Sequence, residues 1–259
     1  SLKIAIAFLM LLRPKTTFRD KPMKRLIVLA GGFGTRLREL VSDVPKPLAP
    51  VGGKPFIVHL IEHWVAQDVK EFVFLLHFEA SLIETILLEL LNDKRFGNIK
   101  IDVIVEAKPL GTGGAILNAV SELGITDSFL VVNADTWLGH GFEELSAANP
   151  CAIAAVSVPN SQRYGSLIFD EHGISKFEEK SNSIGQAFIS SGLYHLLPNI
   201  FEGFDLGSPF SLEEEIFPNL VTKSMLGVVK LNTSFIDIGI PEDYLKFCKW
   251  IECEKKNVL

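Results

Sequence analysis

The chain has 259 residues, of which 47% are hydrophobic and 22% charged, and its formal net charge is −6 at pH 7. This composition is ordinary for a globular protein with a sizeable core, and the acidic balance argues against a general nucleic-acid-binding surface. The three cysteines are odd in number and lack metal-ligand spacing, so they indicate free thiols in a reducing compartment, the cytoplasm.

The first 22 residues are predicted to be an N-terminal extension of uncertain origin that takes no part in catalysis. Residues 4–12 form an apolar run that is too short to span a bilayer, and no small-residue cleavage site follows it. Met23 stands directly before the first predicted strand and would make a natural start. We therefore expect a single domain over 23–259 without stable membrane insertion; the alternative for 1–22 is a role in membrane contact or oligomerisation.

Strand and helix patterns alternate in the first half of the chain. Apolar strand patterns occupy 26–30, 69–76, 101–105 and 129–133. Helix patterns occupy 55–67, a stretch after a capping-box pair of Ser81 and Glu84, and 111–123. The alternation predicts a Rossmann-like three-layer α/β/α fold with a mostly parallel, mixed central sheet.

The second half changes character. Strand-like segments separated by polar turns occupy 151–158, 166–169, 174–178 and 187–196, and we expect antiparallel strands beside the parallel sheet. Ser211 and Glu214 are predicted to cap a further helix. Two more strands are predicted at 226–231 and 234–238, and a closing helix at 241–252.

The most informative stretch, 29–47, reads LAGGFGTRLRELVSDVPKP and directly follows the first strand. Its glycines give a backbone that can approach a phosphate closely and point several N–H groups at it: Gly31, Gly32 and Gly34. Arg36 and Lys46 add cations suited to a polyanion. These features make a nucleoside triphosphate site the leading hypothesis.

Two better-known phosphate loops do not match this stretch. A dinucleotide fingerprint requires a third glycine where Leu37 stands, which disfavours a dinucleotide-dependent oxidoreductase, and a Walker loop requires Gly-Lys-Ser/Thr. His59 and His63 are spaced four apart on a predicted helix, but they lie among apolar positions without a nearby third ligand. We therefore assign both histidines to the core rather than to a metal site.

Six further blocks follow the loop in order. They are PLGTGGA (109–115), VVNADT (131–136), RYGSLIFD (163–170), FEEK (177–180), SSGLY (190–194) and FIDIGIPEDY (235–244). With these blocks the chain resembles the sugar-1-phosphate nucleotidyltransferases, also called nucleoside-diphosphate-sugar pyrophosphorylases, from about residue 24 to 252. The resemblance implies that a sugar-1-phosphate oxygen attacks the α-phosphorus of a nucleoside triphosphate, and that pyrophosphate leaves.

The resemblance also implies roles for individual residues. The nucleotide site would be formed by Leu29, Ala30, Gly31, Gly32, Gly34, Thr35, Glu106, Pro109, Gly111 and Thr112, with Gly113 and Gly114 also packing under the base and ribose. The catalytic cations would be Arg36 and Lys46. The catalytic Mg²⁺ would be held by Asp135 and Asp237. The sugar phosphate would be bound by Tyr164, Gly165, Glu179, Lys180 and Gly192.

The identity of the two substrates is a finer question. Within the family, the blocks most resemble guanylyltransferases that act on D-glycero-D-manno-heptose 1-phosphate to make a nucleotide sugar for surface glycans. Glu106 fits this expectation, because a carboxylate accepts hydrogen bonds and guanine donates from N1–H and N2–H₂. The alternatives are a mannose-1-phosphate guanylyltransferase and a uridylyl- or thymidylyltransferase that acts on a hexose or amino-sugar 1-phosphate.

A different class of function is a catalytically silent nucleotide sensor on the same fold. Such relatives lose the arginine, the lysines or the metal carboxylates, whereas here all are present: Arg36, Lys46, Asp135, Lys180 and Asp237. We therefore expect an active enzyme that uses GTP, Mg²⁺ and a sugar 1-phosphate. The sequence is also compatible with a homo-oligomer.

Overall fold

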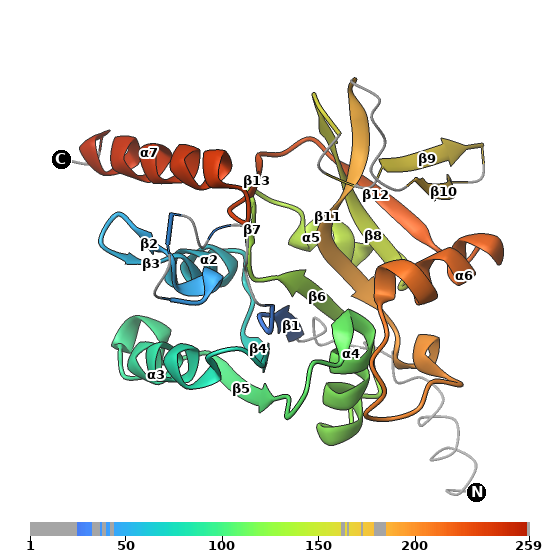
Figure 1. Cartoon of the computed structure of the whole chain (residues 1–259), viewed down its shortest axis with the longest axis horizontal. Helices are drawn as coiled ribbons and strands as arrows, with labels where there is room; N and C mark the ends of the chain where they lie inside the picture. The colour runs from blue at the N-terminus through green and yellow to red at the C-terminus, as the bar shows by residue number, and fades with distance from the viewer. Residues whose placement is uncertain are drawn as a thin grey trace, which may run out of the picture.

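One mixed sheet runs through the molecule in the strand order β10-β9-β11-β6-β1-β4-β5, with β8 paired to β11 and β12 paired to β8 (Figure 1). The computed structural model describes residues 25–32, 37, 40–41, 44–161, 164, 166–171, 173–178 and 185–257. The expectation for residues 1–22 therefore lies outside the described residues. Within them, the sheet has nine strands.

The parallel part of the sheet comes from the first half of the chain. It consists of β1 (Arg25–Leu29), β4 (Glu71–Leu76), β5 (Lys100–Val105) and β6 (Phe129–Asn133). Strand β1 pairs in parallel with β4 on one side and with β6 on the other, and β4 pairs in parallel with β5. The central residues of β1 are buried, as expected for a strand covered on both faces. The predicted α/β alternation is confirmed here.

The antiparallel part begins where β11 (Ala187–Leu196) pairs with β6. The other strands of this part are β8 (Ala152–Val158), β9 (Ser166–Asp170), β10 (Gly173–Glu178) and β12 (Gly227–Leu231). Strand β11 pairs antiparallel with β8 and β9, and β9 pairs antiparallel with β10. The expected antiparallel strands are present, although β12 pairs in parallel with β8.

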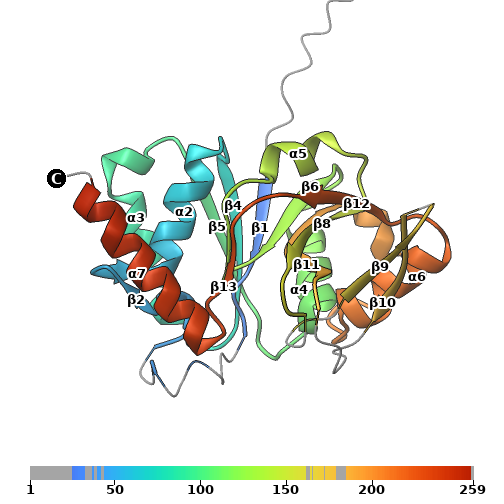
Figure 2. The same cartoon turned by 90° about the horizontal axis from the view of Figure 1, so that it is seen from above.

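Helices cover both faces of the sheet (Figure 2). One face packs against α2 (Phe56–Ala66), α3 (Ala80–Leu91), α5 (Phe142–Ala147) and α7 (Pro241–Asn257). The other face packs against α4 (Gly111–Glu122) and α6 (Phe217–Thr222). Alternate residues of β1 point to opposite faces, so Leu26 and Val28 join one buried cluster and Ile27 joins the other. The three-layer prediction is thus confirmed.

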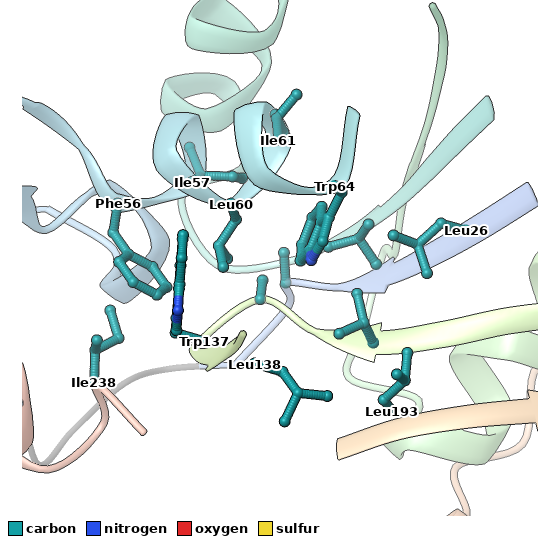
Figure 3. Close-up of a cluster of buried hydrophobic side chains, with 14 of the residues drawn as sticks. Leu26, Phe56, Ile57, Leu60, Ile61, Trp64, Trp137, Leu138, Leu193 and Ile238 are labelled. Atoms are coloured by element: carbon teal, nitrogen blue, oxygen red, sulfur yellow. The ribbon is translucent and has the colours of Figure 1, made fainter. Parts of the chain in front are cut away.

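The larger core cluster explains how α2 and α7 are fixed. Phe56 of α2 lies beside Trp137 and Ile238, whereas Trp64 lies on the side of the cluster nearer the sheet residue Leu26 (Figure 3). Phe247 of α7 is fully buried and meets the Phe56 ring edge-on at a centroid distance of 5.0 Å. Burying one such phenylalanine contributes about 2 kcal/mol, so α7 is held by its apolar face. In the described residues, no helix is both long and apolar enough to cross a membrane.

Two short ribbons and several single turns complete the fold. The ribbons are β2 (Pro50–Val51) with β3 (Lys54–Pro55), and β7 (Thr136–Leu138) with β13 (Phe235–Asp237). The 3-10 turns are η2 (Lys46–Leu48), η3 (Lys94–Phe96) and η4 (Pro198–Phe201), and η5 (Leu212–Ile216) is a π-helix. Strand β7 was not predicted, and β13 was predicted to be longer. Their pairing joins two distant parts of the chain beside the end of β6.

The two predicted caps have different outcomes. The prediction of a capping box at Ser81 and Glu84 was wrong, because α3 begins at Ala80. The residue before it, Glu79, has a left-handed backbone with φ 51°. The Ser81 carbonyl instead accepts from the Thr85 hydroxyl inside the helix. Ser211 is a cap as predicted, since its hydroxyl accepts from the main-chain N–H groups of Glu213 and Glu214, but it caps η5 rather than α6 directly.

Candidate active site

The carboxyl ends of β1, β4, β5 and β6 meet at one edge of the sheet around a cavity of about 360 Å³. Open α/β sheets bind ligands at this edge. The cavity is lined by predicted site residues: Leu29, Ala30, Gly31, Gly32, Lys46, Glu106, Pro109, Gly111, Thr112 and Asp135. The predicted residues Gly34, Thr35, Arg36, Gly165, Glu179 and Lys180 lie outside the described residues.

Sequence reasoning missed several lining residues, among them His77 and Asn133. His77 directly follows β4, and Asn133 is the last residue of β6. Both occupy the kind of position at which Asp135 was recognised, since residues after parallel strands gather at one edge. A search for polar residues at the carboxyl ends of all the predicted parallel strands would therefore have found them. The Nδ1 atom of His77 lies 2.9 Å from the Glu106 carbonyl oxygen, which ties the ends of β4 and β5 together.

Lys46 and Asp135, which both line the cavity, form an ion pair. The lysine Nζ donates to Asp135 Oδ2 at 2.7 Å, and the two side chains are 19% and 31% exposed. Lys46 begins η2 between two prolines, whose fixed backbone angles restrict where the lysine can lie. The Thr136 hydroxyl lies 3.3 Å from the other carboxylate oxygen, Oδ1. The pair joins Lys46, near the end of the 29–47 stretch, to the residue that follows β6 by two positions.

Asp237 reaches the same place from the other end of the chain. It ends β13 opposite Thr136 of β7, and the next main-chain N–H, of Ile238, donates to the Asp135 carbonyl at 2.9 Å. Burial and the neighbouring Asp135 carboxylate raise the pKa of Asp237 to about 6. The Gly239 N–H, which donates to Asp237 Oδ1 at 2.8 Å, and Lys46 oppose this rise in pKa.

A glycine lies beside these charged groups, where any side chain would force them to move. A Cβ atom on Gly239 would lie 2.6 Å from Lys46 Nζ and 2.8 Å from Asp237 Oδ1, both too close for a side chain. The absence of a side chain at Gly239 therefore lets Lys46 and Asp237 share one small space. This explains part of the Ile-Asp-Ile-Gly pattern from which Asp237 was recognised.

The carboxylates of Asp135 and Asp237 form a hard oxygen donor set. Mg²⁺ typically binds one or two protein carboxylates and takes its remaining ligands from water and substrate phosphates, so this pair fits it. Across the part of the chain that the structure describes, no group of three or more His, Cys, Asp or Glu side chains could hold a metal by itself. His63 is instead placed with Nε2 2.8 Å from the Leu138 carbonyl and its ring stacked on Trp137.

Glu106 lies at the opposite end of the cavity lining. Its Oε2 accepts from the Leu110 N–H at 2.9 Å, and burial raises the pKa of its carboxyl. A Cβ atom on Gly31 would lie 3.6 Å from Glu106 Oε1 and 3.3 Å from the His77 Cβ. The glycine turn after β1 thus passes close to this carboxylate, and Oε1 faces it.

The glycines at the start of α4 have two different environments. Gly111 lines the cavity, as predicted, with a left-handed φ of 70°, and a Cβ there would lie 2.5 Å from the Phe210 carbonyl oxygen. Gly113 and Gly114 are buried instead against Phe210 and Ser208. The expectation that these two pack under base and ribose is corrected: their small size admits the chain that crosses the helix start.

Tyr164 and Gly192 lie on the antiparallel side, away from the cavity lining. The Tyr164 ring packs edge-on against Phe235 at a centroid distance of 5.7 Å. Gly192 has a left-handed φ of 73°, and a Cβ there would lie 2.7 Å from Asn133 Nδ2. Gly192 therefore borders β6, which carries the cavity residues, and Tyr164 borders β13, which carries Asp237.

Comparison with known proteins places the chain among sequences with related chemistry. The sequence profile of the Nucleotidyl transferase family matches residues 25–253. The D-glycero-alpha-D-manno-heptose 1-phosphate guanylyltransferase of Campylobacter jejuni subsp. jejuni is 34% identical over 223 residues, which are 85% of this chain and 97% of that protein.

Two further relatives extend the comparison. The mannose-1-phosphate guanyltransferase of Neurospora crassa is 34% identical over 230 residues, 85% of this chain, although the chain spans only 62% of that protein. The crystal structure of HddC from Yersinia pseudotuberculosis complexed with GMP-PN superposes with a TM-score of 0.76. That chain is 34% identical in sequence, and the match covers 88% of this chain and all of that one.

Proposed function

The chain belongs to the nucleotidyl transferase family, and from that premise we propose that it transfers GMP from GTP to D-glycero-D-manno-heptose 1-phosphate and releases pyrophosphate. The product is then GDP-heptose. The observation that carries the proposal is the cavity, whose lining contains the Glu106 carboxylate and the Lys46–Asp135 ion pair, with Asp237 beside that pair.

The nucleotide occupies the parallel half in this proposal. Glu106 Oε1 accepts from the N–H groups of guanine, while Oε2 stays bonded to the Leu110 N–H. Gly31 and Gly32 offer main-chain N–H groups to the phosphates, with Arg36 for the β- and γ-phosphates. The glycine turn follows β1 directly, so these donors lie at the sheet edge where the cavity opens.

The reacting phosphates lie at the Lys46 end of the cavity. Asp135 and Asp237 would hold Mg²⁺, which when bound neutralises charge on the phosphates. Lys46 places a fixed positive charge beside the same group and stabilises the charge that develops as pyrophosphate leaves. Because both reactants are anions, alignment and charge neutralisation supply most of the rate enhancement.

The sugar phosphate approaches from the antiparallel half. Lys180 binds its phosphate and Glu179 its hydroxyl groups, with Tyr164, Gly165 and Gly192 forming the walls. Gly192 supports this assignment by its place, because it packs against Asn133, which ends β6 and lines the cavity. A second acceptor, mannose 1-phosphate, is favoured by the similarity to the Neurospora crassa enzyme, but the chain covers much less of that protein than of the heptose enzyme.

A substrate screen tests the proposal. The purified chain is incubated with Mg²⁺, each of GTP, ATP, UTP and dTTP, and either heptose 1-phosphate or mannose 1-phosphate, and pyrophosphate release is followed. GTP with heptose 1-phosphate should give the highest kcat/KM. Faster turnover of mannose 1-phosphate would move the acceptor assignment to mannose, and turnover of UTP or dTTP but not GTP would refute guanylyl transfer.

A further inference from the structure

A partly buried carboxylate, Glu213, lies outside the catalytic group and accepts from three hydroxyl groups. Thr112 Oγ1 and Ser211 Oγ donate to Glu213 Oε2 at 2.6 and 2.9 Å, and the Tyr194 hydroxyl donates to Oε1 at 3.2 Å. Ser211 comes from the start of η5, whereas the other two donors come from α4 and β11. Glu213 therefore connects three elements that are distant in sequence.

The Thr112 hydroxyl is fully engaged by this arrangement. Its single proton goes to Glu213, and its oxygen also accepts from the Leu212 N–H at 2.9 Å. Thr112 lines the nucleotide cavity, so its hydroxyl cannot also donate to a phosphate there. The role of this hydroxyl is to fix the first turn of α4, which carries Gly111 along the same cavity wall.

The Tyr194 hydroxyl connects Glu213 to β11, in the antiparallel part of the sheet. Tyr194 is 2% exposed, and burial together with the Glu213 charge raises its pKa, so its hydroxyl remains a proton donor. Ser190 Oγ lies 3.5 Å from the tyrosine oxygen, and the Gly192 N–H donates to Ser190 Oγ at 3.4 Å. A chain of polar contacts thus runs from Gly192, beside the proposed sugar site, to Glu213.

We propose that Glu213 is a positioning residue that holds the start of α4 in register with β11, and so aligns the nucleotide half of the site with the acceptor half. This inference rests on the proposed function. A π-helix immediately follows Ser211, and such turns often mark functional segments. Glutamine has one acceptor oxygen where glutamate has two, so Glu213→Gln must present an N–H₂ group to one limb and break it with almost no change in shape.

The test compares four single variants. Thr112→Val removes the nucleotide-side limb, Tyr194→Phe removes the acceptor-side limb, and Glu213→Gln disturbs the junction. Glu214→Gln is the matched control, because Glu214 is the next residue of the same turn and is exposed. For each variant we would measure kcat, the KM for GTP, the KM for the sugar phosphate, the melting temperature and the Kd for GDP.

We expect Thr112→Val to raise the KM for GTP and Tyr194→Phe to raise the KM for the sugar phosphate, each about threefold to tenfold. Glu213→Gln should raise both KM values, and adding Thr112→Val to it should raise the KM for GTP by less than the product of the single effects. Glu214→Gln should match the wild type. Wild-type KM values in folded Glu213→Gln, or in folded Thr112→Val and Tyr194→Phe, would overturn the inference.

The GDP titration separates this inference from the proposed function, because it requires no turnover. Weaker GDP binding in Glu213→Gln and Thr112→Val, with wild-type binding in Glu214→Gln, would support the positioning role whichever sugar phosphate is the acceptor. Equal GDP affinity in the wild type, Glu213→Gln, Thr112→Val and Glu214→Gln would overturn it, even if the wild type makes GDP-heptose. A merely structural role would lower the melting temperature without separating the two KM values.

Discussion

The parallel and antiparallel halves of the sheet bring residues to the site by different rules. In the parallel half, β1, β4, β5 and β6 all end at one edge, and each delivers its next residues to the cavity. In the antiparallel half, neighbouring strands end at opposite edges, so a strand end does not identify a site residue. Asp237 arrives by a third route, through the separate two-stranded ribbon of β7 and β13. Lys46, Asp135 and Asp237 thus meet beside the end of β6, the strand that pairs in parallel with β1 and antiparallel with β11.

The two carboxylates illustrate this difference. Asp135 follows a parallel strand and has a cation partner, with Lys46 Nζ 2.7 Å away. Asp237 is supplied by the ribbon, and its burial beside Asp135 raises its pKa to about 6. Asp135 has a direct cation partner, whereas the Gly239 N–H and Lys46 offset only part of the cost of ionising Asp237. A bound divalent cation would neutralise the second charge, which is a reason to find this pair at a metal-dependent site.

Removing either carboxylate should have the largest effect, because the proposed metal site then loses one of its two protein ligands. We expect Asp135→Asn and Asp237→Asn each to lower kcat by at least about a hundredfold, with the far-UV circular dichroism spectrum unchanged. Pyrophosphate release at saturating Mg²⁺ measures the effect. Asp127→Asn, at an exposed position, is the control. Near-normal turnover in either site variant would remove that residue from the metal assignment.

The same contrast explains how far the sequence could predict the structure. The parallel half was predicted well, because apolar runs and glycine turns are local signals, and Asp135 could be assigned from its place after a strand. Asp237 could be assigned only through the family resemblance. No local pattern joins residues so far apart in the chain, and β7, which completes the connection, has only three residues.

Long-range hydrogen bonds were the least predictable part of the site. Glu213 meets Thr112 across 101 positions of sequence, and the sequence shows only a glutamate after a capping serine. The packing of Phe210 against Gly113 and of Ser208 against Gly114 is equally non-local, so those glycines could be read as ligand-binding residues. At the start of α3 the failed prediction concerned local structure, since the left-handed Glu79 precedes the helix and no serine caps it.

Stability against pH should separate the two carboxylates next. Because folding raises the Asp237 pKa from 3.8 to about 6, the folded state favours the protonated form. The associated stability is fully present below pH 3.8 and is lost as the pH rises through about 6. Asp237→Asn cannot ionise. At pH 8 without Mg²⁺ its free energy of unfolding should therefore exceed that of the wild type by about 1 to 3 kcal/mol, and its urea midpoint should be higher.

The two proteins should become alike towards pH 4, where the wild-type carboxyl is protonated on folding. Urea titrations at pH 5 and pH 8 in metal-free buffer measure this, and Asp127→Asn again provides the control. Added Mg²⁺ should stabilise the wild type and reduce the difference, since a cation that binds only the folded state shifts unfolding by mass action. A constant difference between wild type and Asp237→Asn across this pH range would contradict the assignment of the raised pKa.

The smallest expected effect lies wholly within the parallel half, at Glu106. Its Oε2 is already bonded to the Leu110 N–H, so only Oε1 remains for the base. One charge-assisted hydrogen bond to the guanine amino group corresponds to a preference of about tenfold or more for GTP over inosine triphosphate, which lacks that group. In Glu106→Gln this ratio of kcat/KM values should fall towards one, while the KM for the sugar phosphate stays unchanged.

An unchanged ratio would move base recognition away from Glu106. A raised KM for the sugar phosphate would show that the two halves are coupled at Glu106 as well, because nothing in the parallel half alone would carry the change to the acceptor.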